Sequence, residues 1–118
     1  MFEAENIADW RGRDVVDKDG SKVGTLEALY FDTARDVPTF ATVRTGFVGR
    51  RRLTFVPLAD AVVSPDHVKV AESKDTIKSA PTIEVEGALS VQDEPAVFEH
   101  YGLVYERGSG GERRLARR

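Results

Sequence analysis

The sequence predicts a mainly β protein: a small, strongly bent antiparallel β-barrel followed by short C-terminal helices. Short apolar segments, each ended by a turn-forming residue, occupy residues 13–70 of the 118-residue chain. Asp19-Gly20 lies between the first two segments and is typical of a tight β-hairpin. Strands this short cannot build two full sheets, whereas a curled sheet buries them and leaves fewer free edges.

The first part of the chain predicts the strands in order. A helical turn at residues 6–10 is expected to place Trp10 over one end of the barrel. Alternating or continuous apolar residues predict strands over residues 13–17, 22–32, 39–44, 53–57, 61–64 and 67–70. Gly24, within the longest strand, suits a bend or a close backbone contact. A two-residue hairpin at Asp19-Gly20 requires positive φ at both residues.

The remaining chain predicts two short helices. Ser73 is expected to cap a helix over residues 73–78, which ends before Pro81. A second helix over residues 90–101 brings Phe98 and Tyr101 onto one apolar face. Gly102 is expected to end this helix as its C-cap.

These elements divide the chain into three parts. We expect a barrel-like β domain at residues 1–71, a C-terminal helical segment at residues 72–106 and a flexible basic tail at residues 107–118. The helical segment packs either on its own barrel or on a second subunit, and the sequence leaves both arrangements open. The tail carries five arginines and one glutamate.

Composition excludes several classes of protein. The chain has no cysteine, so disulfides and cysteine-ligated metals are excluded. No segment approaches the roughly 18 consecutive apolar residues of a membrane span, and the acidic N-terminus is unlike a signal peptide. A cytoplasmic protein is therefore expected. The net charge is −3 although the tail is basic, and this acidic body argues against broad nucleic-acid binding.

No residue pattern indicates catalysis, a metal or a cofactor. The two histidines, His67 and His100, lack further ligands at metal-binding spacing. Asp17-Lys18-Asp19-Gly20 departs from a calcium loop, which needs glycine at its sixth position. The serines occupy turns, caps and the tail, and the Asp93-Glu94 pair suits the start of a helix. We therefore expect no enzyme activity and no cofactor.

Two features indicate contacts with other molecules. The Arg50-Arg51-Arg52 run, with Arg44 across a hairpin, is expected to form a basic patch. This patch is a solvated barrel rim, a site for an acidic protein surface or another copy of the chain, or a nucleic-acid site. Phe47-Val48, flanked by glycines, is either an exposed interface anchor or a cover over the barrel mouth.

The stretch of residues 10–70 resembles a PRC-barrel domain. The residues that carry the resemblance are Gly12-Arg13-Asp14-Val15-Val16, Asp19-Gly20-Ser21-Lys22-Val23-Gly24, Tyr30-Phe31-Asp32 and Phe55-Val56-Pro57-Leu58. This family includes barrels of the photosynthetic reaction centre H subunit and of a ribosome maturation factor. Residues 77–103 are similar to the tail of stand-alone bacterial members. The resemblance implies a protein-interaction module without catalytic residues.

The sequence thus predicts a non-catalytic protein-interaction module that acts as a homodimer and has an unidentified protein partner. The interaction candidates are Arg44, Phe47, Val48, Arg50, Arg51, Arg52, Phe98 and Tyr101. The alternative is a nucleic-acid- or ribosome-associated binding protein that uses Arg44 and the arginine run. A ligand-binding barrel ranks last, because side chains fill so small an interior.

Overall fold

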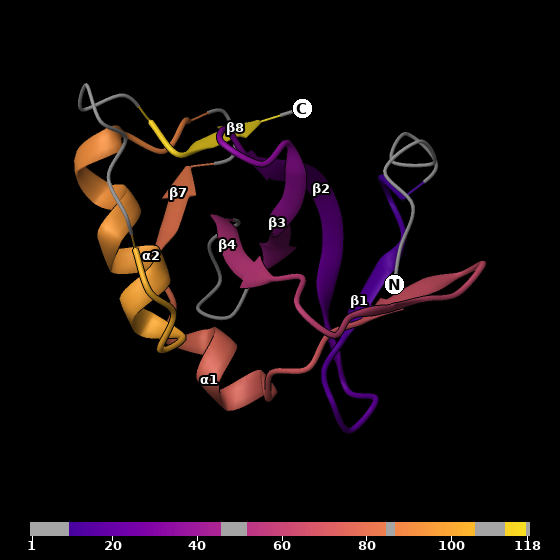
Figure 1. Ribbon diagram of the computed structural model, residues 1–118. Coiled ribbons are helices and arrows are strands. Elements are labelled where there is room, and N and C mark those ends of the chain that lie inside the picture. The colour runs from indigo at the N-terminus through magenta and orange to yellow at the C-terminus, as the bar shows by residue number, and fades with distance from the viewer. Residues whose placement is uncertain (1–9, 46–51, 85–86, 106–112, 118) are drawn as a thin grey trace.

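The computed structural model describes residues 10–45, 52–84, 87–105 and 113–117, which are mainly β (Figure 1). The strands are β1 (Asp14–Val16), β2 (Lys22–Asp32), β3 (Val37–Thr45), β4 (Arg52–Pro57), β5 (Val62–Val63), β6 (His67–Lys69), β7 (Thr82–Glu84) and β8 (Leu115–Arg117). The helices are α1 (Lys74–Lys78), the 3-10 turn η2 (Val91–Asp93) and α2 (Glu94–His100).

The described strands form one sheet in the order β5-β6-β1-β2-β3-β4-β7, with β8 paired to β2. The long strands β2 and β3 form its centre and pair antiparallel. The expectation of a wholly antiparallel sheet is wrong at one pair, because β1 and β6 run parallel. The chain crosses from β4 to the far side of β1 before it forms the β5–β6 hairpin, which projects from the body in Figure 1.

The described strands do not close into a barrel. β5 and β7 lie at the two ends of the strand order and do not pair with each other. The sheet is instead irregular, with register shifts between β2 and β3 at Leu26/Ala28 and Tyr30/Phe31 and a further shift between β1 and β2. Such shifts bend a strand and increase its twist.

The central strands are covered on both faces, and this accounts for their apolar residues at both odd and even positions. Ala41 and Val43 of β3 belong to one buried cluster, which Ile77 of α1 joins. Phe40 belongs to a second cluster, which includes Val97 and Phe98 of α2. The C-terminal segment therefore packs on its own chain's sheet in this structure.

The Asp19-Gly20 turn differs from the predicted two-residue hairpin. Gly20 has a φ of 87°, whereas Asp19 is not among the described residues with positive φ. A longer loop forms instead, because the Asp17 N–H donates to Ser21 O over 2.8 Å. Asp17 Oδ1 accepts hydrogen bonds from the N–H groups of Asp19 and Ser21, which favours this longer turn.

Asp17 also joins the turn to α1. Its Oδ2 accepts a hydrogen bond from Lys74 N at 2.9 Å, at the start of the helix. Burial alone would raise the pKa of Asp17, but the backbone N–H donors of Lys74, Ser21 and Asp19 outweigh it and lower the pKa below its ordinary value. The predicted N-cap is confirmed, since the Ser73 hydroxyl accepts from Thr76 N.

Two short strands were not predicted from the sequence. β7 follows Pro81, and β8 lies in the segment expected to be a flexible tail. That expectation is wrong for residues 113–117, because β8 pairs with the end of β2 and Leu115 is fully buried. Leu115 is the one large apolar residue of this strand and gives no apolar pattern in the sequence, although its burial helps to hold the strand.

Gly24 confirms the predicted close backbone contact and supports a first test. A Cβ atom added there would collide with the Arg44 carbonyl oxygen and lie 2.9 Å from Val43 Cγ1. We expect Gly24→Ala to lower the free energy of unfolding by about 2 kcal/mol, because the β2–β3 ladder must shift. Urea denaturation measures this change, with Thr25→Ala as the neighbouring control. Equal midpoints for Gly24→Ala and wild type would contradict the close contact.

Candidate functional site

A groove of about 440 Å³ opens where the β2–β3 turn, the β4–β5 connection and the segment after α2 meet. We call it the apolar groove. Its lining comprises Asp32, Arg35, Val37, Pro38, Thr39, Pro57, Leu58, Ala59, Asp60, Phe98, Leu103, Val104, Tyr105 and Arg114. Its volume falls within the range of small-molecule sites, and most of its lining residues are apolar.

Exposed apolar side chains gather at the apolar groove. Four large hydrophobic residues are exposed among those described, and three of them line it: Val37 at 45 %, Leu103 at 37 % and Val104 at 84 %. The fourth, Val62 at 59 %, belongs to β5 and lies outside the groove. Single exposed hydrophobics are common, but a contiguous group of them marks an interaction surface.

The end of α2 places two of these side chains. Gly102 ends the helix as predicted, although it directly follows the C-cap, which is Tyr101: Gly102 takes a φ of 70° and its N–H donates to Glu99 O. The Leu103 N–H donates to Phe98 O at 2.9 Å. The chain therefore turns sharply after the helix and carries Leu103 and Val104 along the groove.

Buried Glu94 holds the segments around this groove together. Its Oε1 accepts hydrogen bonds from Tyr105 Oη at 2.7 Å and Arg114 N at 3.0 Å. Its Oε2 accepts from Leu115 N at 3.1 Å. One fully buried carboxylate thus joins the start of α2, the segment after α2 and β8.

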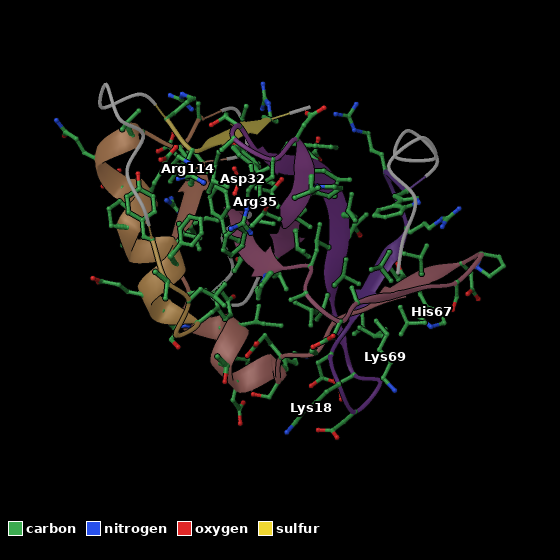
Figure 2. All side chains as sticks on the ribbon, viewed as in Figure 1. Lys18, Asp32, Arg35, His67, Lys69 and Arg114 are labelled. Atoms are coloured by element: carbon green, nitrogen blue, oxygen red, sulfur yellow. The ribbon has the colours of Figure 1, made fainter. Side chains whose placement is uncertain are left out.

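The β2–β3 turn begins with Asp32 and presents Arg35 to solvent. Asp32 Oδ1 accepts hydrogen bonds from the N–H groups of Ala34 and Arg35 at 2.8 and 3.2 Å. Asp36 completes the turn with a φ of 56°. Figure 2 shows Asp32, Arg35 and Arg114 at the same end of the sheet.

The charge of Asp32 is already matched by Arg114. Arg114 Nη2 lies 3.2 Å from both carboxylate oxygens, and both side chains are largely buried. Burial would raise the pKa of Asp32, but the Ala34 N–H, the Arg114 guanidinium and the Arg35 N–H outweigh it and lower the pKa. Asp32 and Arg114 therefore form an ionised pair with no net charge.

Two other charges of the groove are exposed. Arg35 forms no side-chain hydrogen bond or ion pair with the part of the chain that the structure describes, and the same holds for Asp60. Asp60 has a φ of 62° in the turn after β4, which the Ala61 N–H closes by donating to Leu58 O. The apolar groove thus offers one exposed cation and one exposed anion.

Arg44, one member of the predicted basic patch, is paired with an acidic side chain of its own chain. Arg44 Nη2 donates to Glu27 Oε1 at 2.6 Å, and Lys22 Nζ lies 3.3 Å from Asp14 Oδ1. With Arg11, these cations line a second hollow of about 530 Å³. Ion pairing leaves little charge there for phosphate groups, and binding of nucleic acid stays a prediction.

Arg44 and Arg52 do not share one face of the sheet. Arg44 is opposite Leu53 in the β3–β4 register, whereas Arg52 is opposite Thr45, so the two arginines project from opposite faces. Arg52 Nε donates instead to Thr82 Oγ1 at 2.6 Å. Grouping them in one patch was therefore wrong, because they occupy positions of opposite parity. Phe47, Val48, Arg50 and Arg51 lie outside the described residues.

Phe98 and Tyr101 contact their own sheet. The Phe98 ring packs edge-on against Phe40 with centroids 5.1 Å apart, and only 9 % of the residue is exposed. Tyr101 Oη donates to Phe55 O at 2.6 Å. Of these two predicted candidates, Phe98 reaches the apolar groove, as part of its lining.

The histidines occupy separate environments. His67 Nδ1 lies 2.8 Å from Asp66 Oδ1, and His100 Nε2 lies 2.7 Å from Thr76 O. Within the described ranges, no group of three or more His, Cys, Asp or Glu side chains is placed to hold a metal ion. No helix among the same residues has the length and apolar character needed to cross a membrane.

Sequence reasoning missed most of the apolar groove. Val37, Leu103 and Val104 come from connections far apart in the chain, and Arg35 and Asp60 are ordinary turn residues. One local signal was available: two large apolar residues directly follow Gly102, which ends the helix, and a polar loop is common at such a position.

Comparison with protein families gives one match. The family model of the PRC-barrel domain matches residues 2–77, which is more than half of the chain and includes β1 through most of α1. No curated protein sequence matches the chain. The matched stretch contains the residues that carry the resemblance in the sequence, and the chain belongs to the PRC-barrel domain family.

Proposed function

We propose that this protein is a non-catalytic protein-interaction module that acts as a homodimer through the apolar groove. One observation carries the proposal: three of the four exposed large hydrophobics of the described residues surround this groove. Burial of apolar surface stabilises association by about 25 cal/mol per Å², so a contiguous patch contributes more than scattered residues.

The character of the groove residues supports a binding role. Its exposed groups are aliphatic side chains and two isolated charges, and its buried carboxylate, Asp32, is held by Arg114 and two backbone N–H groups. Acid–base or nucleophilic chemistry needs a reactive group with a base or acid in hydrogen-bond reach. The cysteine-free composition is compatible with a cytoplasmic site of action, which we also propose.

The proposed dimer differs from one in which the C-terminal segment clasps a second copy. Phe98 and Val97 already pack on the sheet of their own chain. The exposed side chains of Leu103 and Val104, on the outer side of this segment, are still available to contact a partner. The interface would therefore use the surface that the segment presents after it has packed.

Val104→Asp tests the proposal. Val104 is the most exposed of the groove's hydrophobics, so the substitution should leave folding intact. We expect it to raise the dimer dissociation constant by about tenfold or more, because a two-fold interface places two new carboxylates in an apolar contact. Light scattering over a micromolar concentration series measures this constant.

Val62→Asp is the matched control, since Val62 is also exposed but lies on β5 outside the groove. The control should dimerise like the wild type. A wild-type protein that stays monomeric throughout the series would refute the homodimer. Equal dimerisation of the wild type and Val104→Asp would refute the role of the groove.

A further inference from the structure

We propose that two copies associate groove to groove about a two-fold axis, with Arg35 of each copy paired to Asp60 of the partner subunit. This inference rests on the proposed homodimer and adds the charged pair that orients it. The inference depends on the charge pattern of the apolar groove, which one exposed cation and one exposed anion line together with exposed aliphatic side chains.

The charges of the groove sum to a neutral surface. Asp32 and Arg114 neutralise each other through contacts of 3.2 Å from Arg114 Nη2 to both carboxylate oxygens. Arg35 and Asp60 add one charge of each sign, and neither is paired with another described residue. A strongly acidic or basic partner would meet one of these charges unfavourably, whereas a second copy of the same surface can match both.

Two-fold symmetry produces two Arg35–Asp60 contacts in each dimer. In an isologous contact, if Arg35 faces Asp60 of the partner subunit, then Asp60 faces the partner's Arg35. Val37, Leu103 and Val104 provide the aliphatic part of the same surface and would meet the aliphatic part of the partner subunit's groove. This arrangement would combine apolar contacts with charged pairs, as protein interfaces commonly do.

Hydrogen bonds hold the backbone at both charged residues, Arg35 and Asp60. The Arg35 N–H is held by Asp32 Oδ1 at 3.2 Å, and Asp60 lies in a turn closed by the 3.0 Å hydrogen bond from Ala61 N to Leu58 O. The Leu58 N–H donates to Thr39 O at 3.0 Å, which ties the Asp60 turn to β3. Both charges thus lie in turns that hydrogen bonds tie to the strands, and this limits the backbone ordering required on binding.

Charge reversal in trans tests the pairing. Arg35→Glu places two carboxylates opposite each other at both symmetry-related contacts, and Asp60→Lys places two cations there. Each variant alone should raise the dimer dissociation constant by about tenfold, because like charges at an interface are repulsive. An equimolar mixture should form a heterodimer with near wild-type affinity, since both of its contacts then join opposite charges. Native mass spectrometry distinguishes the three dimers by mass.

Controls separate pairing from folding and from net charge. Lys69→Glu makes the same charge change on β6, away from the groove, and should dimerise like the wild type (Figure 2). Asp60→Asn removes the charge with a residue that tolerates positive φ, so it should weaken the dimer without unfolding the turn. Circular dichroism verifies that each variant is folded.

The outcomes distinguish this inference from the proposed function. A monomeric wild type overturns the homodimer and the pairing together. A wild-type dimer that both reversals leave unchanged overturns the pairing alone, because the copies then meet through another arrangement. Single variants that weaken the dimer without rescue in the mixture also overturn the direct Arg35–Asp60 contact.

Discussion

Replacing Glu94 with alanine should lower the free energy of unfolding by about 3 kcal/mol. The carboxylate is fully buried and accepts hydrogen bonds from Tyr105 Oη, Arg114 N and Leu115 N. Alanine leaves these three donors without their acceptor, and the desolvation penalty of each unpaired group is what destabilises the fold. Urea denaturation followed by circular dichroism measures the loss.

Glu94→Ala should also destabilise one region of the fold more than the rest. Its three donors lie in the segment after α2 and at the start of β8, so we expect amide hydrogen exchange to accelerate most at Leu115. Glu99→Ala, at an exposed position of the same helix, should change stability by less than about 0.5 kcal/mol. If Glu94→Ala were as stable as Glu99→Ala, the stabilising role of the three hydrogen bonds to Glu94 would be contradicted.

Phe98→Ala should have an effect of similar size and lower the free energy of unfolding by about 3 to 4 kcal/mol. The ring packs edge-on against Phe40 and Tyr105, with both centroid distances at 5.1 Å. Its removal leaves a cavity beneath α2 and ends both aromatic contacts. Tyr101→Phe is the milder comparison, because it deletes only the hydrogen bond to Phe55 O and should lose about 1 kcal/mol.

Protein concentration tells whether α2 packs within one chain. Val97 is fully buried against its own sheet and does not line the apolar groove, so the difference in stability between Val97→Ala and wild type should be the same at low and high concentration. If the helix instead packed on a second copy, the difference would grow with concentration and vanish for dilute protein. Thermal unfolding at concentrations far below and above the dimer dissociation constant separates the two cases.

The sequence predicted most of the strands because their signals are local. The Lys22–Asp32 strand agrees residue for residue with the prediction, whereas the next strand begins at Val37, before Pro38 and two residues earlier than predicted. Ser73 and Gly102 confirmed the helix ends, because caps depend on a side chain or a φ value within a few residues. The family was likewise accessible from the turn and strand pattern.

What the sequence could not provide depends on residues far apart in the chain. The parallel β1–β6 pair follows from the path of the β4–β5 connection, which periodicity does not encode. β8 is held by Glu94 and β2, so neither its strand nor the burial of Leu115 shows in a short window. Arg44 and Arg52 looked like one patch because sequence proximity does not reveal the register between strands.

The contact between Asp32 and Arg114 joins residues 82 positions apart. Local structure at the β2–β3 turn therefore cannot neutralise Asp32 by itself. The docking of β8 against the end of β2 brings the guanidinium to the carboxylate, and loss of that docking would leave the turn with an unmatched negative charge.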